Sequence, residues 1–477
     1  MDNLAEIKSP EIRKDREQKL SSEAWTQRSS DNFALQTVGK AVPKDFGSGS
    51  LELFDSSKLA KNGSDNGKTQ ESKNESLKTG PKEQISSSSD QKKTAFDSQQ
   101  PGDKLQFKPE GRVVKIENSW QLDNLQIEKG MTVMLVPGMQ YKIHHALKLP
   151  DGASIIGDKN NPPSIDYVGK LDEVRMKNGK KELHHLWPHI IEPKGDNNVI
   201  DGVKVECSKS NMDVKGGAIG IFAGEGVKNL KIQNCSSGKI DSFISLIGAD
   251  HTSIENCHSP VVGSYFLWND QLSKNTTLKD SSCGDSRREW TVRSYGDNFR
   301  VEHCALINLS RGNVVKGALA LYKGNAELVD SFISGGMRVG PQHGDVHGAQ
   351  YVDPKHIDRL KPNLSPQQRQ AAETLRDQMS LHASGNYIEG GLCLNQNAKD
   401  VVFENNDIYR ASAKNGSYIV FTEYRKIYSG FRDKAEAIFK NNRFGGPVDK
   451  ILNNPSHSPV TIGEGNTFNG KAVRPKG

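Results

Sequence analysis

The chain has 477 residues, of which 34% are hydrophobic and 26% charged, and its mean hydropathy is −0.67. This polarity is high for a wholly globular chain of that length, so we expect a disordered part, a fold with a large polar surface, or both. The net charge of +6 is too small, without clustering, to indicate nucleic-acid binding. No apolar run approaches the ~18 residues of a membrane span, so we expect no membrane-crossing helix.

Residues 1–108 are predicted to be disordered. Ser, Lys, Asn, Gln, Asp and Glu dominate the segment, and Ser86–Ser89 are consecutive serines. Such a composition buries too little apolar area to offset the chain entropy of folding. The first twenty residues are charged and contain no apolar core, so no secretory signal peptide is visible. Two interpretations stay open: a flexible tail of a cytoplasmic protein, or the leader of a bacterial protein that is secreted by a signal-peptide-independent route.

From residue 109 to residue 477 a short motif recurs. An apolar–polar–apolar triplet is followed by Asn, Asp, Ser or Cys, with copies at 203–207, 230–235, 253–257, 277–281, 301–304 and 328–331. A period of roughly 20–30 residues with one short strand per repeat is typical of a stacked solenoid. We therefore predict an all-β, single-stranded parallel β-helix, expected to be monomeric. Asn and Asp suit the bend that follows each strand, and stacked Asn side chains can form a ladder.

The cysteines follow the same repeat. Cys207, Cys235, Cys257 and Cys304 are predicted to share one register in successive coils, and the chain has no CxxC pair. This pattern favours a ladder of buried, reduced thiols over a disulfide framework or a zinc site.

The repeat is lost over an insertion at about 341–384. Within it, residues 365–381 are predicted to be helical, with Ser365 as the N-cap and Pro366 in the first turn. Insertions in solenoids emerge on one face, which is often the binding face.

Counting back from the bends predicts a column of polar residues on one face. Asp270, Arg293 and either Tyr322 or Lys323 should lie close together, because coils stack at ~4.8 Å. Such a column is either a catalytic or ion site on a rigid sheet or a solvated face with exposed ion pairs.

Two loops carry further candidates. His343, Asp345, His347 and Gln350 lie within eight residues of a Gly-rich segment, where they would supply a general base and sugar contacts or would order the insertion. Trp187 lies among histidines, where it would either stack on a sugar ring or pack as a core aromatic.

Residues 289–340 resemble a family pattern. The segment contains Glu289, the run Arg293–Asn298, then Tyr322–Asn325 and Gly335–Arg338. This order and spacing resemble polysaccharide lyase family six, which contains chondroitinase B and alginate lyases, within the pectin lyase-like superfamily of right-handed parallel β-helices. The family has a lysine where Arg293 stands, and Arg-His where this chain has Tyr322 and Lys323.

The resemblance implies cleavage of an acidic, uronate-containing polysaccharide by β-elimination. Calcium held by Asn269 or Asp270 and by Glu289 would neutralise the uronate carboxylate, and Arg338 would clamp it. Because arginine stays protonated, Arg293 is a poor base, and Tyr322, Lys323 or His343 would transfer the proton.

Three alternatives to the lyase stay open. A hydrolase on the same fold would use two carboxylates, such as Asp345 with Asp270 or Asp297. A solenoid that binds a glycan without cleaving it would need only the groove, and an injected effector would act on a host molecule.

Overall fold

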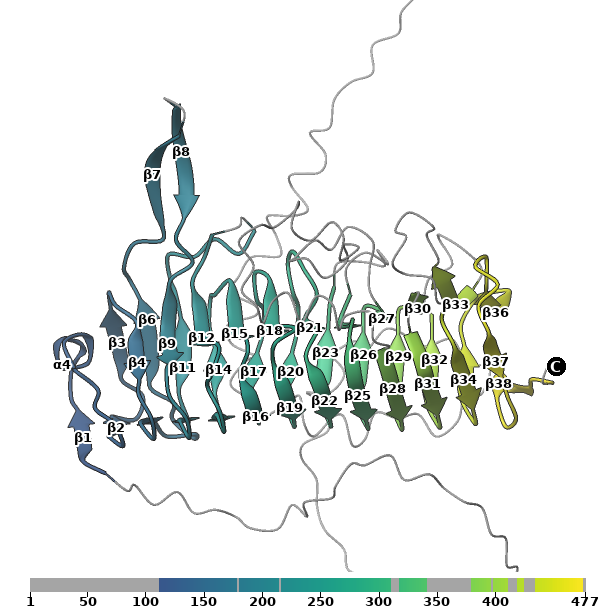
Figure 1. Cartoon of the computed structure of the whole chain (residues 1–477), viewed down its shortest axis with the longest axis horizontal. Coiled ribbons are helices and arrows are strands. Elements are labelled where there is room, and N and C mark those ends of the chain that lie inside the picture. Colours follow the sequence, from purple (N-terminus) through teal and green to yellow (C-terminus); the bar gives the residue numbers. More distant parts are fainter. Residues whose placement is uncertain are drawn as a thin grey trace, which may run out of the picture. The chain divides into compact units, whose positions relative to one another are not determined.

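The computed structural model describes residues 111–177, 180–213, 216–309, 317–340, 379–395, 398–410, 418–423 and 434–474, and all of them belong to one compact unit. Short strands dominate this part of the chain and stack into three long sheets (Figure 1). The tail predicted over 1–108 lies outside the described residues.

The three sheets, called A, B and C, take one strand from each coil. Sheet A contains β1 (Val113–Ile116), β2 (Thr132–Leu135), β5 (Ser154–Ile156), β10 (Val199–Asp201), β13 (Lys231–Gln233), β16 (Asp250–Glu255), β19 (Lys274–Lys279), β22 (Asp297–Glu302), β25 (Gly324–Val329), β28 (Met379–Ser384), β31 (Ala398–Glu404), β34 (Ala437–Lys440) and β37 (Val460–Ile462). Sheet B contains β3 (Gln140–Ile143), β6 (Ser164–Tyr167), β11 (Lys204–Glu206), β14 (Ser236–Ser237), β17 (His258–Ser259), β20 (Ser282–Cys283), β23 (Ala305–Ile307), β26 (Phe332–Ser334), β29 (Tyr387–Glu389), β32 (Asp407–Tyr409), β35 (Arg443–Gly445), β38 (Thr467–Phe468) and β39 (Lys471–Ala472). Sheet C contains β4 (Leu147–Leu149), β9 (His189–Pro193), β12 (Ile219–Ala223), β15 (Ser242–Leu246), β18 (Tyr265–Asn269), β21 (Val292–Ser294), β24 (Leu319–Leu321), β27 (Met337–Val339), β30 (Leu392–Asn395), β33 (Tyr418–Glu423) and β36 (Lys450–Asn453).

Neighbouring strands in each sheet are parallel, apart from the antiparallel pair of β38 and β39 at the end of sheet B. They are in register, as in β19, β22 and β25, although the register shifts between β28 and β31. In β19, for example, Thr276 and Leu278 are buried while Thr277 and Lys279 are partly exposed. The inward residues of all three sheets form one continuous apolar core. The chain is therefore a right-handed parallel β-helix, as the repeat predicts.

The corner between sheets A and B is a bend of two residues in most coils. The first residue of the bend adopts a left-handed backbone, which Gly, Asn and Asp tolerate best. It is Gly202, Asn234, Asn256, Asp280, His303, Asp330, Gly385, Asn405, Asn441 or Gly465 in successive coils. The sequence motif therefore marks this corner, which is the most regular part of the coil.

The second residue of the bend points inward and stacks on its equivalents. In successive coils this ladder consists of Val203, Cys235, Cys257, Ser281, Cys304, Ser331, Asn386, Asn406, Asn442 and Asn466. Asn386 donates from its backbone N and from Nδ2 to Oδ1 of Asn406, both at 2.9 Å, and Asn406 repeats the pattern on Asn442. The predicted asparagine ladder is confirmed.

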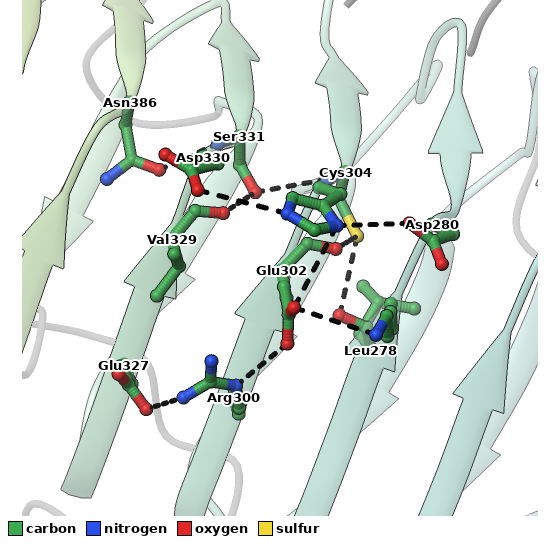
Figure 2. Close-up of polar contacts among 12 residues, drawn as sticks. Leu278, Asp280, Arg300, Glu302, Cys304, Glu327, Val329, Asp330, Ser331 and Asn386 are labelled. Carbon is green, nitrogen blue, oxygen red and sulfur yellow. Dashed lines mark hydrogen bonds and ion pairs between the residues drawn. The ribbon is translucent and has the colours of Figure 1, made fainter. Parts of the chain in front are cut away.

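The thiols in this ladder are buried and reduced. Figure 2 shows Cys304 and its neighbours at the corner, where the backbone N of Cys304 donates to Oγ of Ser331 at 3.0 Å. Burial raises the pKa of Cys304 to about 12, so its thiol stays protonated. The prediction was wrong for Cys207, because Val203 pairs beside Cys235 and Cys207 lies at the far end of β11. The connection in that coil is longer than in the next coils, so the sequence spacing between Cys207 and Cys235 resembles the spacing between true ladder positions.

The coil is interrupted by insertions. A two-stranded antiparallel hairpin, β7 (Asp172–Lys177) and β8 (Lys180–His185), follows β6 and extends beyond the coils (Figure 1). Most of the predicted insertion at 341–384 lies outside the described residues. Residues 379–381, predicted as the end of a helix, are in β28 instead, because Met379, Leu381 and Ala383 alternate inward and pair with β25.

A short helix, α4 (Ser119–Asp123), follows β1 at the first coil. Asn118 caps it by accepting a hydrogen bond from the backbone N of Gln121, and Leu122 is fully buried. The helix covers apolar residues that would otherwise face solvent at the end of the stack.

Candidate functional site

The connections to sheet C differ most between coils. The A–B bends are short, whereas the β7–β8 hairpin lies between sheets B and C. The segment 341–378 likewise connects β27 in sheet C to β28 in sheet A. Variable connections on a rigid scaffold are where binding residues concentrate, so the outer face of sheet C is the best candidate surface.

One row of outward side chains crosses this face. Trp268 pairs with Arg293, and the row continues through Ala320, Arg338 and Cys393. The residue before each of these in its strand points into the core, as Val292 does beside Arg293. Alternation along the strand therefore commits Arg293 and Arg338 to the outer face.

Arg293 is the centre of an aromatic cluster. Its Nη1 donates to the hydroxyl oxygen of Tyr265 at 3.1 Å. Its guanidinium carbon lies 5.1 Å from the ring centroids of Trp268 and Tyr295 and 5.2 Å from that of Tyr322. Cation–π contacts of this kind are worth about 0.5–2 kcal/mol each, more where water is excluded. Arg293 keeps only 2% of its surface exposed, so the cluster holds its charge in a fixed, dry position.

Arg338 repeats this chemistry two strands further along the row. Its guanidinium carbon lies 5.8 Å from the ring centroid of Trp290, and the residue is 3% exposed. A buried guanidinium loses hydration, which makes it a strong binder of carboxylate or another anion that enters its site. Two such groups in one row are an arrangement suited to an acidic ligand.

The predicted column is partly correct. Arg293 and Tyr322 lie in contact, but Asp270 shares a row with Tyr295 and Tyr322, two residues from the row of Arg293. Lys323 is the residue after Tyr322, where the chain leaves sheet C for β25. The position counted back from the bend was wrong by two residues for Asp270, because the connections from sheet C to sheet A differ in length between coils.

The three residues predicted to hold calcium do not converge. Asn269 is fully buried, and its Nδ2 donates to Oγ of Ser294 at 3.0 Å. Glu289 precedes β21 by three positions, so it lies at the opposite strand end from Asn269, which pairs with Ser294. Within the described ranges, no group of three or more His, Cys, Asp or Glu side chains is placed to hold a metal ion. These residues therefore do not fit a calcium site.

The remaining candidates are placed as follows. Trp187 lies half-buried between β8 and β9, with a positive φ of 50°. Asp297, one carboxylate considered for hydrolysis, accepts hydrogen bonds from the backbone N of Asn298 and of Asn325 at 3.1 and 3.0 Å, so it has a structural role at a bend. His343, Asp345, His347 and Gln350 lie outside the described residues, and their roles stay predictions.

Sequence reasoning missed the aromatic residues around Arg293. Tyr265, Trp290 and Tyr295 form a buried cluster with Tyr322, separate from the main core, and the partly buried Trp268 packs against it. A signal was present in the sequence: Tyr265 and Trp268 lie within one strand of sheet C, and Trp290 and Tyr295 flank the next. The register of sheet C was needed to recognise that all four face the same way.

A second polar cluster lies at the A–B corner (Figure 2). Arg300 is paired with Glu302 at 3.0 Å and also with Glu327, and His303 lies between Asp280 and Asp330 at 3.3 and 3.8 Å. Asp280, His303 and Asp330 all occupy the left-handed bend position, and their side chains are 33–59% exposed. Exposed pairs of this kind contribute little, so backbone requirements account for these residues.

A groove of about 700 Å³ is present at the same corner of the first coils, lined by Lys115, Met134, Lys159, Asp201 and neighbouring residues. Its lining comes from sheet A and the A–B bends rather than from sheet C. The groove is therefore separate from the Arg293 cluster.

No protein-family model matches the chain, and no curated protein sequence matches it. Among solved structures, it is similar to the A-module of the Azotobacter vinelandii mannuronan C-5 epimerase AlgE6, at 11% identity and a TM-score of 0.42, over 72% of this chain and 91% of that one. It is also similar to the catalytic domain of a GH87 alpha-1,3-glucanase in complex with nigerose, at 12% identity and a TM-score of 0.37, over 74% and 68% of the two chains.

A third similar structure is the Dettilon tailspike protein, at 10% identity and a TM-score of 0.35, over 71% of this chain and 60% of that one. At such identities the likeness concerns the parallel β-helix alone and carries no argument about activity. Among the residues that the structure describes, no helix is long and apolar enough to cross a membrane.

Proposed function

We propose that this protein binds an acidic polysaccharide on the outer face of sheet C and cleaves it by β-elimination beside Tyr265. The observation that carries the proposal is the hydrogen bond from Arg293 Nη1 to the Tyr265 hydroxyl oxygen, in a row that also contains Arg338. Tyr265 is 9% exposed, whereas Arg293, Tyr295 and Tyr322 are 0–2% exposed. Among the buried members of the cluster, Tyr265 is thus the best placed to meet a ligand, and the partly buried Trp268 packs against its ring.

The reaction needs three things from the protein. A base takes the C5 proton of a uronate unit, the electron pair forms the C4–C5 double bond, and the C4–O bond breaks so that the leaving oxygen takes up a proton. The uronate carboxylate must be neutralised, because negative charge builds up beside it in the transition state. A protein group must then supply and receive protons at the reacting carbon and oxygen.

The described residues offer these roles. Tyr265 would act as the proton-transfer group, since the charge-assisted hydrogen bond from Arg293 supports the phenolate oxygen. Arg338, which is only 3% exposed, would stabilise the uronate carboxylate through its charge rather than by direct contact. This assignment places the base at Tyr265 rather than at Tyr322, whose 1% exposure and position beneath Arg293 leave it little access to substrate.

Binding without cleavage is the second candidate function. It is favoured by the aromatic character of the cluster, because Trp and Tyr faces combined with guanidinium groups hold a ligand without any proton transfer. The proposal that the chain is an exported effector concerns its route and target rather than this face, and it stays a prediction.

Ultraviolet absorbance of unsaturated product tests the proposal. Wild type, Tyr265→Phe and Arg293→Lys are assayed on alginate, polygalacturonate, chondroitin sulfate and hyaluronan. Tyr387→Phe is the matched control, because Tyr387 is a partly buried tyrosine on sheet B that stacks on Phe332. We expect Tyr265→Phe to lower the rate by about 10²–10⁴-fold, the usual contribution of a general acid–base group, and the control to keep wild-type activity.

Other outcomes separate the alternatives. Product formation that survives both Tyr265→Phe and Arg293→Lys would contradict the role of Tyr265. Binding of a polymer without product would favour the non-catalytic function. Neither binding nor product on any polymer would overturn the proposal that the ligand is an acidic polysaccharide.

A further inference from the structure

His189 and Glu192 form a polar pair at the start of sheet C. Nδ1 of His189 lies 3.2 Å from Oε1 of Glu192, and Nζ of Lys194 lies 2.6 Å from the same oxygen. The imidazole stacks on the ring of Phe222, with centroids 3.8 Å apart and an interplanar angle of 12°. These contacts fix both the position and the orientation of the imidazole.

The pair also fixes the tautomer of His189. A carboxylate only accepts hydrogen bonds, so Nδ1 must carry the hydrogen that faces Glu192. In the neutral ring, Nε2 then keeps its lone pair. Burial lowers the pKa of His189, against the opposing effect of Glu192, so the neutral form dominates at pH 7. Among the described residues no hydrogen bond to Nε2 is formed, and the side chain is 24% exposed.

This pair lies in the same rows as the proposed catalytic cluster. His189 pairs with Ile219, Ile219 with Ser242, and Ser242 with Tyr265. Ile191 pairs with Ile221, so the next residue, Glu192, lies opposite Phe222. The row that contains Glu192 and Phe222 continues through Ser245 to Trp268. His189 and Tyr265 are therefore separated by three strand steps on one face.

The charges around the pair suit an acidic chain. The negative charge of Glu192 is neutralised by Lys194, and Lys148 lies opposite Glu192 on the neighbouring strand β4. The local sum of these three side chains is positive, which attracts an anionic ligand to this end of the face.

We propose that Nε2 of His189 forms a remote subsite, which accepts a hydrogen bond from a hydroxyl group of an acidic oligosaccharide that extends across the strands from Tyr265 to His189. The inference rests on the function proposed above and adds the direction of the bound oligosaccharide, which lies along the stack of coils. Three strand steps span roughly 14 Å, or about three sugar units, since a pyranose unit advances a chain by about one coil step. A ligand must exceed that length to use both centres.

Length-dependent binding tests the subsite. Binding of a disaccharide and a hexasaccharide, prepared from each of the four polymers named above, is measured by calorimetry on wild type, His189→Asn and His189→Gln. Asparagine keeps a donor toward Glu192 but lacks the outer acceptor, whereas glutamine places an amide oxygen near the Nε2 position. We expect His189→Asn to weaken hexasaccharide binding about tenfold, the effect of one lost hydrogen bond, and to leave disaccharide binding within about twofold. His189→Gln should restore most of the loss.

His258→Asn is the matched control. His258 is also partly buried, on sheet B, but both of its ring nitrogens are already bonded, to Ser282 Oγ at 2.9 Å and to Asn256 Oδ1 at 2.8 Å. It should not affect binding at either length. Hexasaccharide binding that is unchanged in His189→Asn, or equal weakening at both lengths, would overturn the subsite while leaving the proposed function intact. Failure of wild type to bind either ligand would instead overturn the proposed function and the subsite with it.

Discussion

The asparagine ladder makes a quantitative prediction about stability. Asn406 lies in its middle: its Oδ1 accepts from the backbone N and from Nδ2 of Asn386, and its Nδ2 donates to the carbonyl of Ala383 and to Oδ1 of Asn442. Asn406→Ala removes all four hydrogen bonds in a site that is 1% exposed. The backbone N–H of Asn386 is left without its acceptor, a loss of about 1–3 kcal/mol for a buried donor.

The other three hydrogen bonds contribute about 0.5–1.5 kcal/mol each. We therefore expect Asn406→Ala to lower the free energy of unfolding by about 2.5–7.5 kcal/mol, a large part of the 5–15 kcal/mol typical of folded proteins. Asn406→Ser is the informative partner, because serine already occupies the ladder at Ser331. There its Oγ accepts from the backbone N of Cys304 at 3.0 Å and donates to the carbonyl of Val329 at 2.8 Å. Serine should recover about 1–3 kcal/mol of the loss.

Urea unfolding followed by circular dichroism measures these differences. Hydrogen exchange of β31 and β32 shows whether the loss is local, since solenoid coils need not unfold together. Asn405→Gly is the control, because Asn405 is exposed and its positive φ of 58° suits glycine. Equal stability of the alanine and serine variants, within about 0.5 kcal/mol, would refute the reasoning that hydrogen bonding rather than side-chain volume makes the ladder stable.

Three further predictions concern other buried groups. The thiol of Cys304, with its pKa raised to about 12, should resist iodoacetamide at pH 8 in the native protein and react in urea; native labelling seen by mass spectrometry would contradict its burial. Burial raises the pKa of Asp123, but hydrogen bonds from His144 and His145 outweigh this effect, so the pKa is lowered overall. Asp123→Asn should therefore destabilise the protein at pH 6–7, and the difference in stability should fade below about pH 4, as the pH drops through the folded-state pKa. A difference in melting temperature that does not depend on pH would refute this. Asp241 is fully buried against Arg288, so Asp241→Ala should cost about 3–5 kcal/mol, and adding Arg288→Met should recover part of it in a double-mutant cycle.

The coil and its corner can be predicted from the amino-acid sequence alone. The motif at each bend, as in Val301–Cys304, specifies its own structure. Alternating burial defines the strand, and the left-handed backbone at His303 defines the turn. Both are local properties of a few residues, so a repeat count finds them without knowing which coils touch. The ladder followed because equal positions in stacked coils must meet, and only Cys207, beyond an unusually long connection, was misplaced.

The candidate site was decided by the tertiary structure. Arg293 and Tyr322 were identified from the sequence, but their partners Tyr265, Trp268 and Tyr295 were not, because contact across sheet C depends on its register. That register is set by connections of varying length, and a shift of one residue moves a side chain to the other face. Asn269 shows the consequence: it was predicted to bind an ion on the surface, yet the pairing of β18 with β21 turns it into the core. Local periodicity thus predicts which residues form strands, whereas only the packing of one coil on the next decides which side chains contact one another on the outer faces of the sheets.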